Sequence, residues 1–482
     1  MHPQIILRFL GILIFFLGLL MAPPLGVSIF FRDGCALEWV FAILAPCLLG
    51  GFFIVFTTSQ KGETLNHRDG VAIVTLGWIM AGLVGALPYL FIGAIPGFTD
   101  AYFESVSGFT TTGASVITQI EALPEGILLW RSLTQWLGGM GIIVLSIAIL
   151  PFLGIGGMQL YKAEIPSPVV DKLKPRISET ARVLWKIYVV LTLLQMVLLM
   201  AGEMKPFDAV CHAFCTMPTG GFSTQNASIA QYNNAYFDYV IAIFMLLAGI
   251  NFSLHYRLIK GDLKIFGKDS ECRVFLIIVG ALILLVTLDI YGEVYETLSD
   301  AFRFAVFQIS SIITTTGFVS ADYEKWPVFS QAIILTCMFF GAMAGSTGGG
   351  IKIIRLMLMM KHGYQQVFSI IHPHAVTTVK LGGKPVSTEI LSSIWGFFIL
   401  YMGLFVLASL IMTALGLDFI SAFSSVAASI GNIGPGFSMV GPVKNFLEIP
   451  TAGKWVLISC MILGRLEIYT VIVLLVPEFW RS

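Results

Sequence analysis

GFTTTGAS, at residues 108–115, recurs in altered form three more times along this chain of 482 residues. Each version is preceded by a short segment with an acidic start and is flanked by two long apolar segments. Each contains a glycine that follows an alanine by 12 residues: Ala101 and Gly113, Ala209 and Gly221, Ala305 and Gly317, Ala422 and Gly434. Four matches at one spacing predict four repeats of a unit made of a helix, a half-helix with its loop, and a second helix.

The composition indicates a membrane protein. The chain is 57% hydrophobic and only 12% charged, with a mean hydropathy of +0.88, whereas soluble domains carry about 25% charged residues. A helix that crosses the bilayer needs about 20 apolar residues, and such runs recur from Ile5 to Val476. Lys and Arg number 28, as do Asp and Glu, so there is no basic excess to attract nucleic acid. We therefore predict an all-α integral membrane protein that crosses the bilayer many times.

The repeat pattern also predicts where each unit begins and ends. An extra pair of N-terminal transmembrane helices is expected at residues 1–62, followed by repeats at 63–165, 166–265, 266–380 and 381–482. The first apolar run is expected to be a membrane helix, because it is long and no small-residue cleavage pattern of a signal peptide follows it. The four repeats are expected in a pseudo-fourfold arrangement around one pore.

The half-helices are too short to span a bilayer, so each loop must end at membrane depth. Non-helical backbone survives there only where protein buries it or water covers it. A pore meets this condition, because carbonyl groups of extended Thr/Gly loops can replace the hydration shell of a cation, towards which the negative ends of the half-helix dipoles also point. Close helix packing would explain one glycine-rich loop but not four at one register. The sequence therefore predicts a cation filter.

The placement of charges predicts the orientation. Lys and Arg gather in the connections between repeats, which the positive-inside rule assigns to the cytoplasm: Lys61, Arg68, Lys162, Lys172, Lys174, Arg176, Arg182, Lys186, Arg257, Lys260, Lys264, Lys268, Arg273, Lys361, Lys380 and Lys384. The loops then enter from outside, and two N-terminal helices plus eight from the repeats leave both termini in the cytoplasm. Acids near the half-helices either concentrate cations at the mouth or cap helix N-termini: Asp100, Glu104, Asp208, Asp300 and Asp418.

Seven motifs carry a resemblance to a known family: GFTTTGAS (108–115), QWLGGMGI (135–142), TGGFST (219–224), TTTGF (314–318), AGSTGGGIK (344–352), NIGPGF (432–437) and GRLEIYT (464–470). Over essentially its whole length the chain resembles TrkH/TrkG-type potassium uptake proteins of the Trk/Ktr/HKT superfamily. The resemblance implies potassium ion uptake across the bacterial inner membrane, with potassium as the substrate. It also implies a selectivity filter formed by Thr110, Thr111, Thr112, Gly113, Thr219, Gly220, Gly221, Thr315, Thr316, Gly317, Asn432, Ile433 and Gly434.

Gly113 bears on the choice of ion. Within that superfamily a serine at this position goes with sodium transport, so the glycine here favours potassium. The second and fourth loops lack the run of three threonines, which predicts fewer well-formed ion sites than a tetrameric potassium channel has.

A second glycine-rich segment, Gly341 to Gly350, interrupts the second helix of the third repeat. So many glycines and small residues should unwind a helix. The resemblance implies that this segment is a gating loop just below the filter, with the residues Gly345, Ser346, Thr347, Gly348, Gly349 and Gly350. A helix kink without a regulatory role is the alternative. A nucleotide-binding P-loop does not fit, because Ile351 stands where that motif requires lysine.

Arg465 lies near the middle of the last apolar run, Trp455 to Val476. A charge at that depth costs at least a few kcal/mol, so its side chain should face a partner or a water-filled pathway. The resemblance implies that this residue lies near the pore beneath the filter, in reach of the gating loop. An ion pair with an acid on a neighbouring helix is the alternative, whereas Glu467, two residues along, points to a different helix face.

The resemblance also implies partners. Members of this family work as homodimers with a peripheral cytoplasmic subunit of the TrkA type, which binds nucleotides. The sequence contains no segment typical of a nucleotide-binding domain, so we expect no nucleotide on this chain itself. The basic connections are the expected docking surface for the partner, membrane lipid surrounds the spans, and no nucleic acid is expected.

Competing functions differ in how well the sequence separates them. A membrane enzyme would need clustered polar catalytic residues, and the histidines His212, His255, His362, His372 and His374 form no HExxH motif. A proton- or sodium-coupled symporter has the same architecture and stays open, as does a sodium-preferring carrier, because filter flexibility as well as glycine content sets selectivity.

Overall fold

The computed structural model describes residues 2–57, 66–148, 177–375 and 377–480. Lys61, the basic residues within 162–176, and the predicted unit boundaries at 62 and 165 lie outside these ranges. In the described part, six helices are long and apolar enough to cross a membrane, or up to eight if each of two bent pairs is counted as one span. That count leaves out α6 (Glu125–Ala148) and the interrupted pair α15 and α16, described below. The chain is a multi-pass membrane protein.

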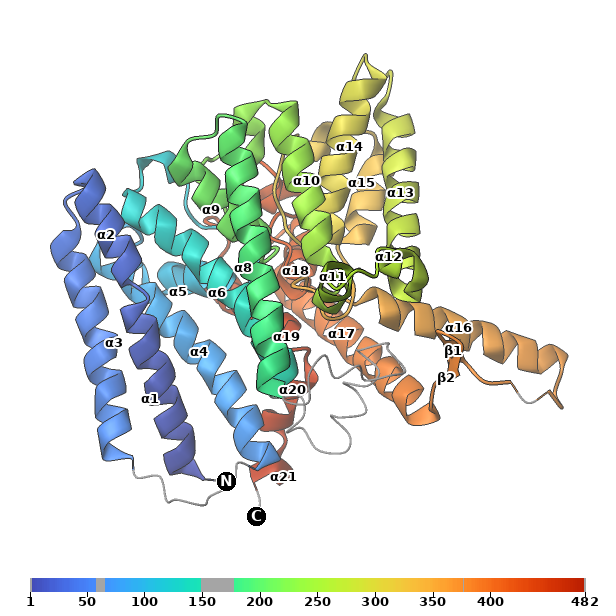
Figure 1. Ribbon diagram of the computed structural model, residues 1–482, viewed down its shortest axis with the longest axis horizontal. Helices are drawn as coiled ribbons and strands as arrows, with labels where there is room; N and C mark the ends of the chain where they lie inside the picture. Colours follow the sequence, from blue (N-terminus) through green and yellow to red (C-terminus); the bar gives the residue numbers. More distant parts are fainter. Residues whose placement is uncertain (1, 58–65, 149–176, 376, 481–482) are drawn as a thin grey trace.

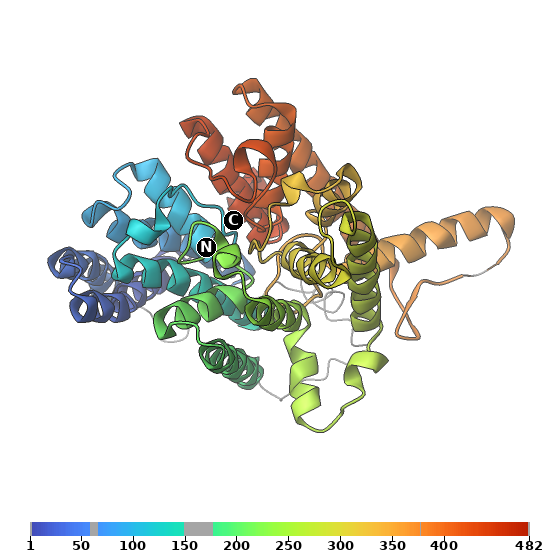
Figure 2. The same cartoon turned by 90° about the horizontal axis from the view of Figure 1, so that it is seen from above.

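Two N-terminal spans lie at one edge of the molecule (Figures 1 and 2). The first consists of α1 (Pro3–Leu19) and α2 (Ala22–Phe31), and the second is α3 (Ala36–Phe56). Two prolines occupy the first turn of α2, where their missing N–H groups are tolerated. The helices α1 and α3 pack closely at Gly11 and Gly50, because a Cβ on Gly11 would lie 3.0 Å from the Gly50 carbonyl oxygen.

The rest of the chain follows the order long helix, short helix, helix four times (Figure 1). The units are α4 (His67–Phe91), α5 (Phe98–Phe109) and α6; α8 (Ile177–Ala201), α9 (Pro206–Thr216) and α10 (Ala235–Gly249); α13 (Ser270–Ile290), α14 (Leu298–Ile313) and α15 (Val328–Cys337) with α16 (Ile353–Ile371); α17 (Thr388–Ala414), α18 (Phe419–Ile430) and α19 (Thr451–Arg465). Each unit thus has one short helix between two longer helical elements, while the predicted bounds of the units stay a prediction.

Shorter elements connect these units. They are α11 (Phe252–Ile259), α12 (Ile265–Lys268), the hairpin of β1 (Lys380–Leu381) and β2 (Lys384–Pro385), α20 (Tyr469–Ile472), α21 (Pro477–Trp480), and 3-10 helices at Ile120–Ala122, Ser228–Tyr232, Tyr323–Lys325, Ser438–Val440 and Val473–Leu475. The helix α16 and the hairpin project away from the body of the molecule (Figures 1 and 2).

The short helices α5, α9, α14 and α18 have polar N-termini and buried C-terminal halves. The Asp418 carboxylate accepts the Ser421 N–H at 3.0 Å at the start of α18, and the Thr297 hydroxyl accepts the Asp300 N–H at 3.1 Å at the start of α14. The bonds from Ser421 hold the pKa of the Asp418 carboxyl below its ordinary value. Most of α18 is buried on all sides, as expected of a helix surrounded by longer ones.

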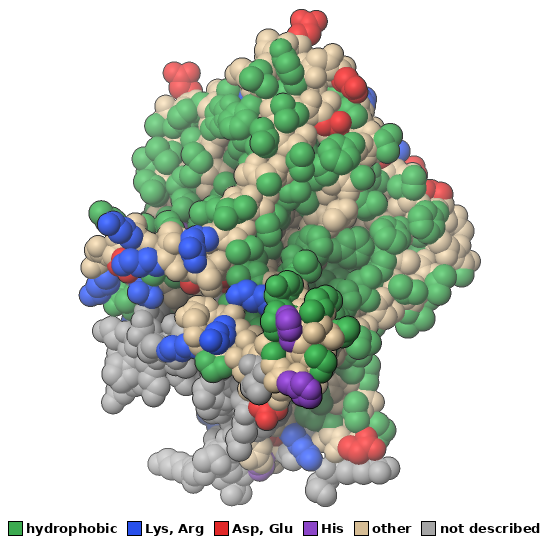
Figure 3. Space-filling model, turned by 90° about the vertical axis from the view of Figure 1, so that its right-hand side faces the viewer, with side chains coloured by type: hydrophobic (Ala, Val, Ile, Leu, Met, Phe, Trp, Pro, Cys, Tyr) green, Lys and Arg blue, Asp and Glu red, His purple; other side chains and the backbone are tan. Residues whose placement is uncertain are grey.

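The outer faces of the long helices are apolar and exposed. On α13, for example, the exposed side chains include Leu276, Ile277, Leu284, Leu285 and Leu288. Figure 3 shows a broad hydrophobic surface, with Lys and Arg gathered below it and Asp and Glu concentrated at the opposite end. An apolar belt between two charged ends is the surface expected of a protein whose solvent is lipid.

Candidate functional site

The four loops after the short helices share one backbone conformation. A residue with positive φ lies two positions before each glycine: Thr111 (53°), Thr219 (57°), Thr315 (60°) and Asn432 (54°). The glycines themselves also have positive φ: Gly113 (80°), Gly221 (79°), Gly317 (81°) and Gly434 (100°). This region of backbone conformation is strained for residues with a Cβ, so the glycines allow the chain to turn in the same way four times.

Each loop is anchored to its own short helix by the same hydrogen bond. The N–H group just before the glycine donates to the carbonyl five residues earlier: Thr112 to Ser107 (2.9 Å), Gly220 to Cys215 (2.8 Å), Thr316 to Ser311 (2.8 Å) and Ile433 to Ala428 (2.8 Å). In the first and third loops two threonine hydroxyls also bond each other at 2.8 Å. The four loops are therefore alike in backbone and differ in side chains.

The loops close into a ring. A Cβ on each glycine would overlap or closely approach a carbonyl oxygen of the next loop: Gly113 that of Gly220, Gly221 that of Thr316, Gly317 that of Ile433, and Gly434 that of Thr112. Each loop thus touches the next in chain order, and the fourth touches the first. The Asn432 amide also donates to the Thr112 hydroxyl at 3.0 Å across this closure. The contacts have the pseudo-fourfold order expected from the repeats.

A cavity of about 180 Å³ opens on one side of the ring and is lined by all four glycines. None of the five acids near the short helices is among the described residues that line it. Asp100 instead pairs with Lys454 at 2.6 Å, Asp208 accepts the Thr224 hydroxyl at 2.7 Å, and Asp418 caps its helix. These contacts favour structural roles for the acids over a role in concentrating cations.

Polar side chains of the short helices hold the loops beyond each glycine. The four contacts are Glu104 with the Val116 N–H (2.9 Å), His212 with the Ser223 hydroxyl (3.0 Å), Gln308 with the Ser320 N–H (3.0 Å) and Ser424 with the Phe437 N–H (2.9 Å). All four of these helix side chains are buried. Each loop is therefore tied to its short helix both before and after the glycine. Glu104 lies behind the loops and so neither lines the mouth nor caps the start of α5, the two roles that the sequence left open for these acids.

Two side chains of α6 add buried support to the first and second loops. Arg131 donates to the Glu104 carboxylate at 2.9 Å and to the Ser223 carbonyl at 3.0 Å. Gln135 donates to the Gly220 carbonyl at 2.7 Å. A buried ion pair is tolerated only where further hydrogen bonds satisfy its charges, and Arg131 meets this condition by joining the first repeat to the loop of the second.

The segment Gly341–Gly350 lies against the ring on the side away from the cavity. It is non-helical, as predicted, because α15 ends at Cys337 and α16 begins at Ile353. The Gly349 N–H donates to the Thr315 hydroxyl at 2.7 Å, and the Thr347 hydroxyl donates to the Met217 carbonyl at 3.0 Å. These partners precede the ring glycines in the chain, whereas the cavity is lined by the glycines and the residues after them.

Arg465 ends α19, where the chain bends by 111° into the next helix. The run Trp455 to Val476 is therefore not one helix, because Glu467 and Ile468 both have a φ of 57°. Arg465 donates to the Thr347 carbonyl at 2.8 Å and to a carbonyl of α6 at 3.3 Å. In the described part of the chain no carboxylate forms an ion pair with Arg465. Its charge is held by carbonyl oxygens next to the non-helical segment.

Comparison with known proteins places the chain in a family. Residues 40–482 match the family model TrkH, described as a cation transport protein. The chain belongs to the TrkH family. It is 42% identical over 492 residues to the Trk system potassium uptake protein TrkH of Escherichia coli (strain K12), with 100% of both chains covered. It is 37% identical over 485 residues to TrkG of the same strain, with 100% of this chain and 99% of TrkG covered.

A solved structure agrees with this assignment. The crystal structure of the potassium transporter TrkH from Vibrio parahaemolyticus matches at a TM-score of 0.91 and 40% identity, with 100% of both chains covered. The family and these relatives are transporters, so this member of the TrkH family is not an enzyme.

In this TrkH-family chain the candidate residues from all four repeats meet at one ring, and the segment 345–350 and Arg465 lie against its other side. Reasoning from sequence missed the supporting roles of Arg131 and Gln135, and it named Glu104 only for a role at the mouth or as a helix cap. A signal for Arg131 was present, because it is a charge within the apolar segment of α6, as Arg465 is in the last helix.

Proposed function

We propose that this protein takes up potassium ions across the bacterial inner membrane through a filter formed by the four loops. The closed ring of glycine loops is the observation that carries the proposal, because a dehydrated cation needs oxygens from several sides. The coordinating groups would come from residues 110–113, 219–221, 315–317 and 432–434. The relatives named as potassium uptake proteins support potassium as the ion carried.

The proposed gate is the segment 345–350 together with Arg465. Its backbone packs against the loops on one side of the ring, so an ion that leaves the filter would meet this segment next. A guanidinium there would raise an electrostatic barrier to cations, because charges interact strongly where water is excluded. Movement of the segment, with loss of the Arg465 bond to Thr347, would open the pathway.

Control is proposed to come from outside the chain. The relatives belong to a Trk system, which supports a second component, and we propose a cytoplasmic nucleotide-binding subunit of the TrkA type that acts on a homodimer. The chain itself would bind no nucleotide. Both termini would lie in the cytoplasm, since α1 begins, and α21 lies, at the end of the molecule from which α4 also starts (Figure 1).

The test is rubidium uptake into liposomes that contain the purified protein, with potassium, sodium and lithium as competitors. Strong competition by potassium alone supports the proposal, whereas equal competition by sodium would favour the sodium-preferring alternative. A pH gradient or a sodium gradient imposed without potassium separates a channel from a coupled symporter, because only a symporter would accumulate rubidium against its own gradient. Gly403→Ser serves as a control, since a Cβ on Gly403 has no heavy atom within 4 Å among its described surroundings.

A further inference from the structure

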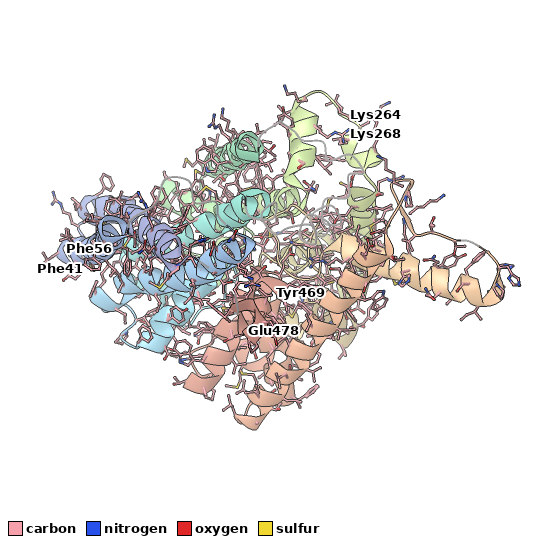
Figure 4. The ribbon with its side chains drawn as sticks, turned by 90° about the horizontal axis from the view of Figure 1, so that it is seen from below. Phe41, Phe56, Lys264, Lys268, Tyr469 and Glu478 are labelled. Carbon is pink, nitrogen blue, oxygen red and sulfur yellow. The ribbon has the colours of Figure 1, made fainter. Side chains whose placement is uncertain are left out.

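The segment from Arg257 to Arg273 carries five cationic side chains, and we call it the basic shelf: Arg257, Lys260, Lys264, Lys268 and Arg273. Asp262 pairs with Lys268 at 3.0 Å and with Arg257 at 3.4 Å. In the described part of the chain, Lys260, Lys264 and Arg273 form no ion pair. Figure 4 shows Lys264 and Lys268 at the outer edge of the molecule. Asp269 and the buried Glu271 are the other acids of this segment, so its five cationic side chains outnumber its acids and leave an excess of positive charge on the exposed side.

Apolar side chains accompany these charges. Ile259 is 69% exposed and Leu263 is 79% exposed, and each is followed directly by a lysine. The helix α11 meets the membrane-spanning α10 at a bend of 101°, so it runs across the end of that helix. At the other end of the basic shelf α13 begins, where Ile277 is 70% exposed on the apolar belt. Ile259 ends α11, and Lys260, Leu263 and Lys264 lie in the connection between α11 and α12. Apolar and cationic side chains side by side at the end of a span are typical of the bilayer interface.

The inner side of the basic shelf and its flanks pack against the residues directly before the segment 345–350 that we propose as the gate. Leu254 and Ile265 share one buried cluster with Ala342, Met343 and Ala344. Residues buried together in one cluster are close-packed, so they do not move independently.

Hydrogen bonds join the same two regions at both ends of the basic shelf. Before it, the Phe252 N–H donates to the Gly345 carbonyl at 3.1 Å. Near its end, in the first turn of α13, the buried Glu271 carboxylate accepts the Ala344 N–H at 2.9 Å and the Ile354 N–H at 3.2 Å. Glu271 of the basic shelf thus contacts Ala344, directly before the segment 345–350, and the first turn of α16, while Phe252 on the flank of the shelf contacts Gly345 itself. A shift of the basic shelf at the membrane surface would move that segment.

We propose that the basic shelf binds the phosphate headgroups of anionic phospholipids at the bilayer surface, and that this contact sets the position of the segment 345–350. Phospholipid supplies both groups that the surface needs, a phosphate for the lysines and acyl chains for Ile259 and Leu263. A soluble cytoplasmic partner could offer carboxylates to the lysines but no acyl chains, and would leave Ile259 and Leu263 without an apolar partner. The binding stands by itself, whereas its effect on transport rests on the proposed function.

The test uses the full chain in phosphatidylcholine vesicles with and without phosphatidylglycerol. A trace of phosphatidylglycerol with a photoactivatable acyl chain reports binding by peptide mapping, and rubidium uptake reports transport. The triple variant Lys260→Gln, Lys264→Gln and Lys268→Gln removes three charges. The matched control changes three exposed lysines on α16 and the hairpin, Lys361, Lys380 and Lys384, to glutamine.

We expect labelling of residues 252–275 in the unchanged protein. Each lysine near an anionic surface contributes about fivefold to binding, so the triple variant should lose labelling by about tenfold or more. Uptake by the unchanged protein should change by about fivefold or more when phosphatidylglycerol is added, and this response should be lost in the triple variant and kept in the control.

Equal labelling of the unchanged protein and the triple variant would overturn the binding site. Uptake that does not respond to phosphatidylglycerol would overturn the link to the gate. If no vesicle shows rubidium uptake, the proposed function fails, and the labelling still decides whether the basic shelf binds lipid.

Discussion

Gly113→Ser tests the ring most directly. The new Cβ would lie well inside the 3.0 Å that real Cβ atoms keep from the nearest heavy atom, here the carbonyl oxygen of Gly220. That oxygen cannot move away freely, because it accepts a hydrogen bond from the Gln135 amide, and the Gly220 N–H donates to the Cys215 carbonyl. Gly113 also has a φ of 80°. The substitution therefore strains both its own loop and the next one.

The size of the expected effect follows from two sources of strain, the positive φ and the contact with the Gly220 carbonyl oxygen. A left-handed backbone costs a residue with a Cβ about 1–2 kcal/mol, and overpacking against a fixed neighbour costs about 1–3 kcal/mol more. The ring relieves this strain by widening, which weakens its fit to a dehydrated potassium ion more than its fit to a partly hydrated one. Since about 1.4 kcal/mol corresponds to tenfold, we expect the potassium-over-sodium preference in rubidium competition to fall by about tenfold or more.

A matched variant separates the backbone strain from the contact with the next loop. Gly292 has a φ of 81°, and no described heavy atom lies within 4 Å of a Cβ placed there. Gly292→Ser therefore carries the backbone strain without the contact and should leave ion preference unchanged. If Gly113→Ser competes like the unchanged protein, or if Gly292→Ser loses preference equally, the ring contact does not set selectivity and the reasoning is refuted.

Three further predictions concern the surroundings of the ring. Arg465→Ala removes the bond to the Thr347 carbonyl, so rubidium uptake should rise severalfold without a change in ion preference, and a changed preference would contradict a gating role. Glu104→Gln leaves the buried Arg131 without its ion-pair partner, which should lower the free energy of unfolding by about 3–5 kcal/mol. Denaturant titration in detergent measures this change. A loss below about 1 kcal/mol would show that the ion pair does not stabilise the fold. Deletion within residues 345–350 should raise rubidium leak into liposomes, and an unchanged leak would leave the segment as a kink.

Local patterns were enough to predict the repeat, the loops and the interrupted helix. Glycine spacing, hydropathy and clustered small residues are read over a few tens of residues, and helices and turns form under the same local constraints. The pattern of acids was less informative, because a carboxylate near a helix start has several local uses. Glu104 illustrates this limit, since its role depends on Arg131, 27 residues away on another helix.

The sequence by itself determined that the chain is an integral membrane protein and that four of its loops are alike, because both properties follow from the composition and spacing of neighbouring residues. Only the tertiary structure decided that each loop touches the next, that Asn432 closes the ring onto Thr112 across 320 residues, and that Arg465 meets the segment 345–350 through a carbonyl oxygen. These contacts join residues far apart in the chain, and packing of the whole helix bundle selects them, so no local pattern specifies them.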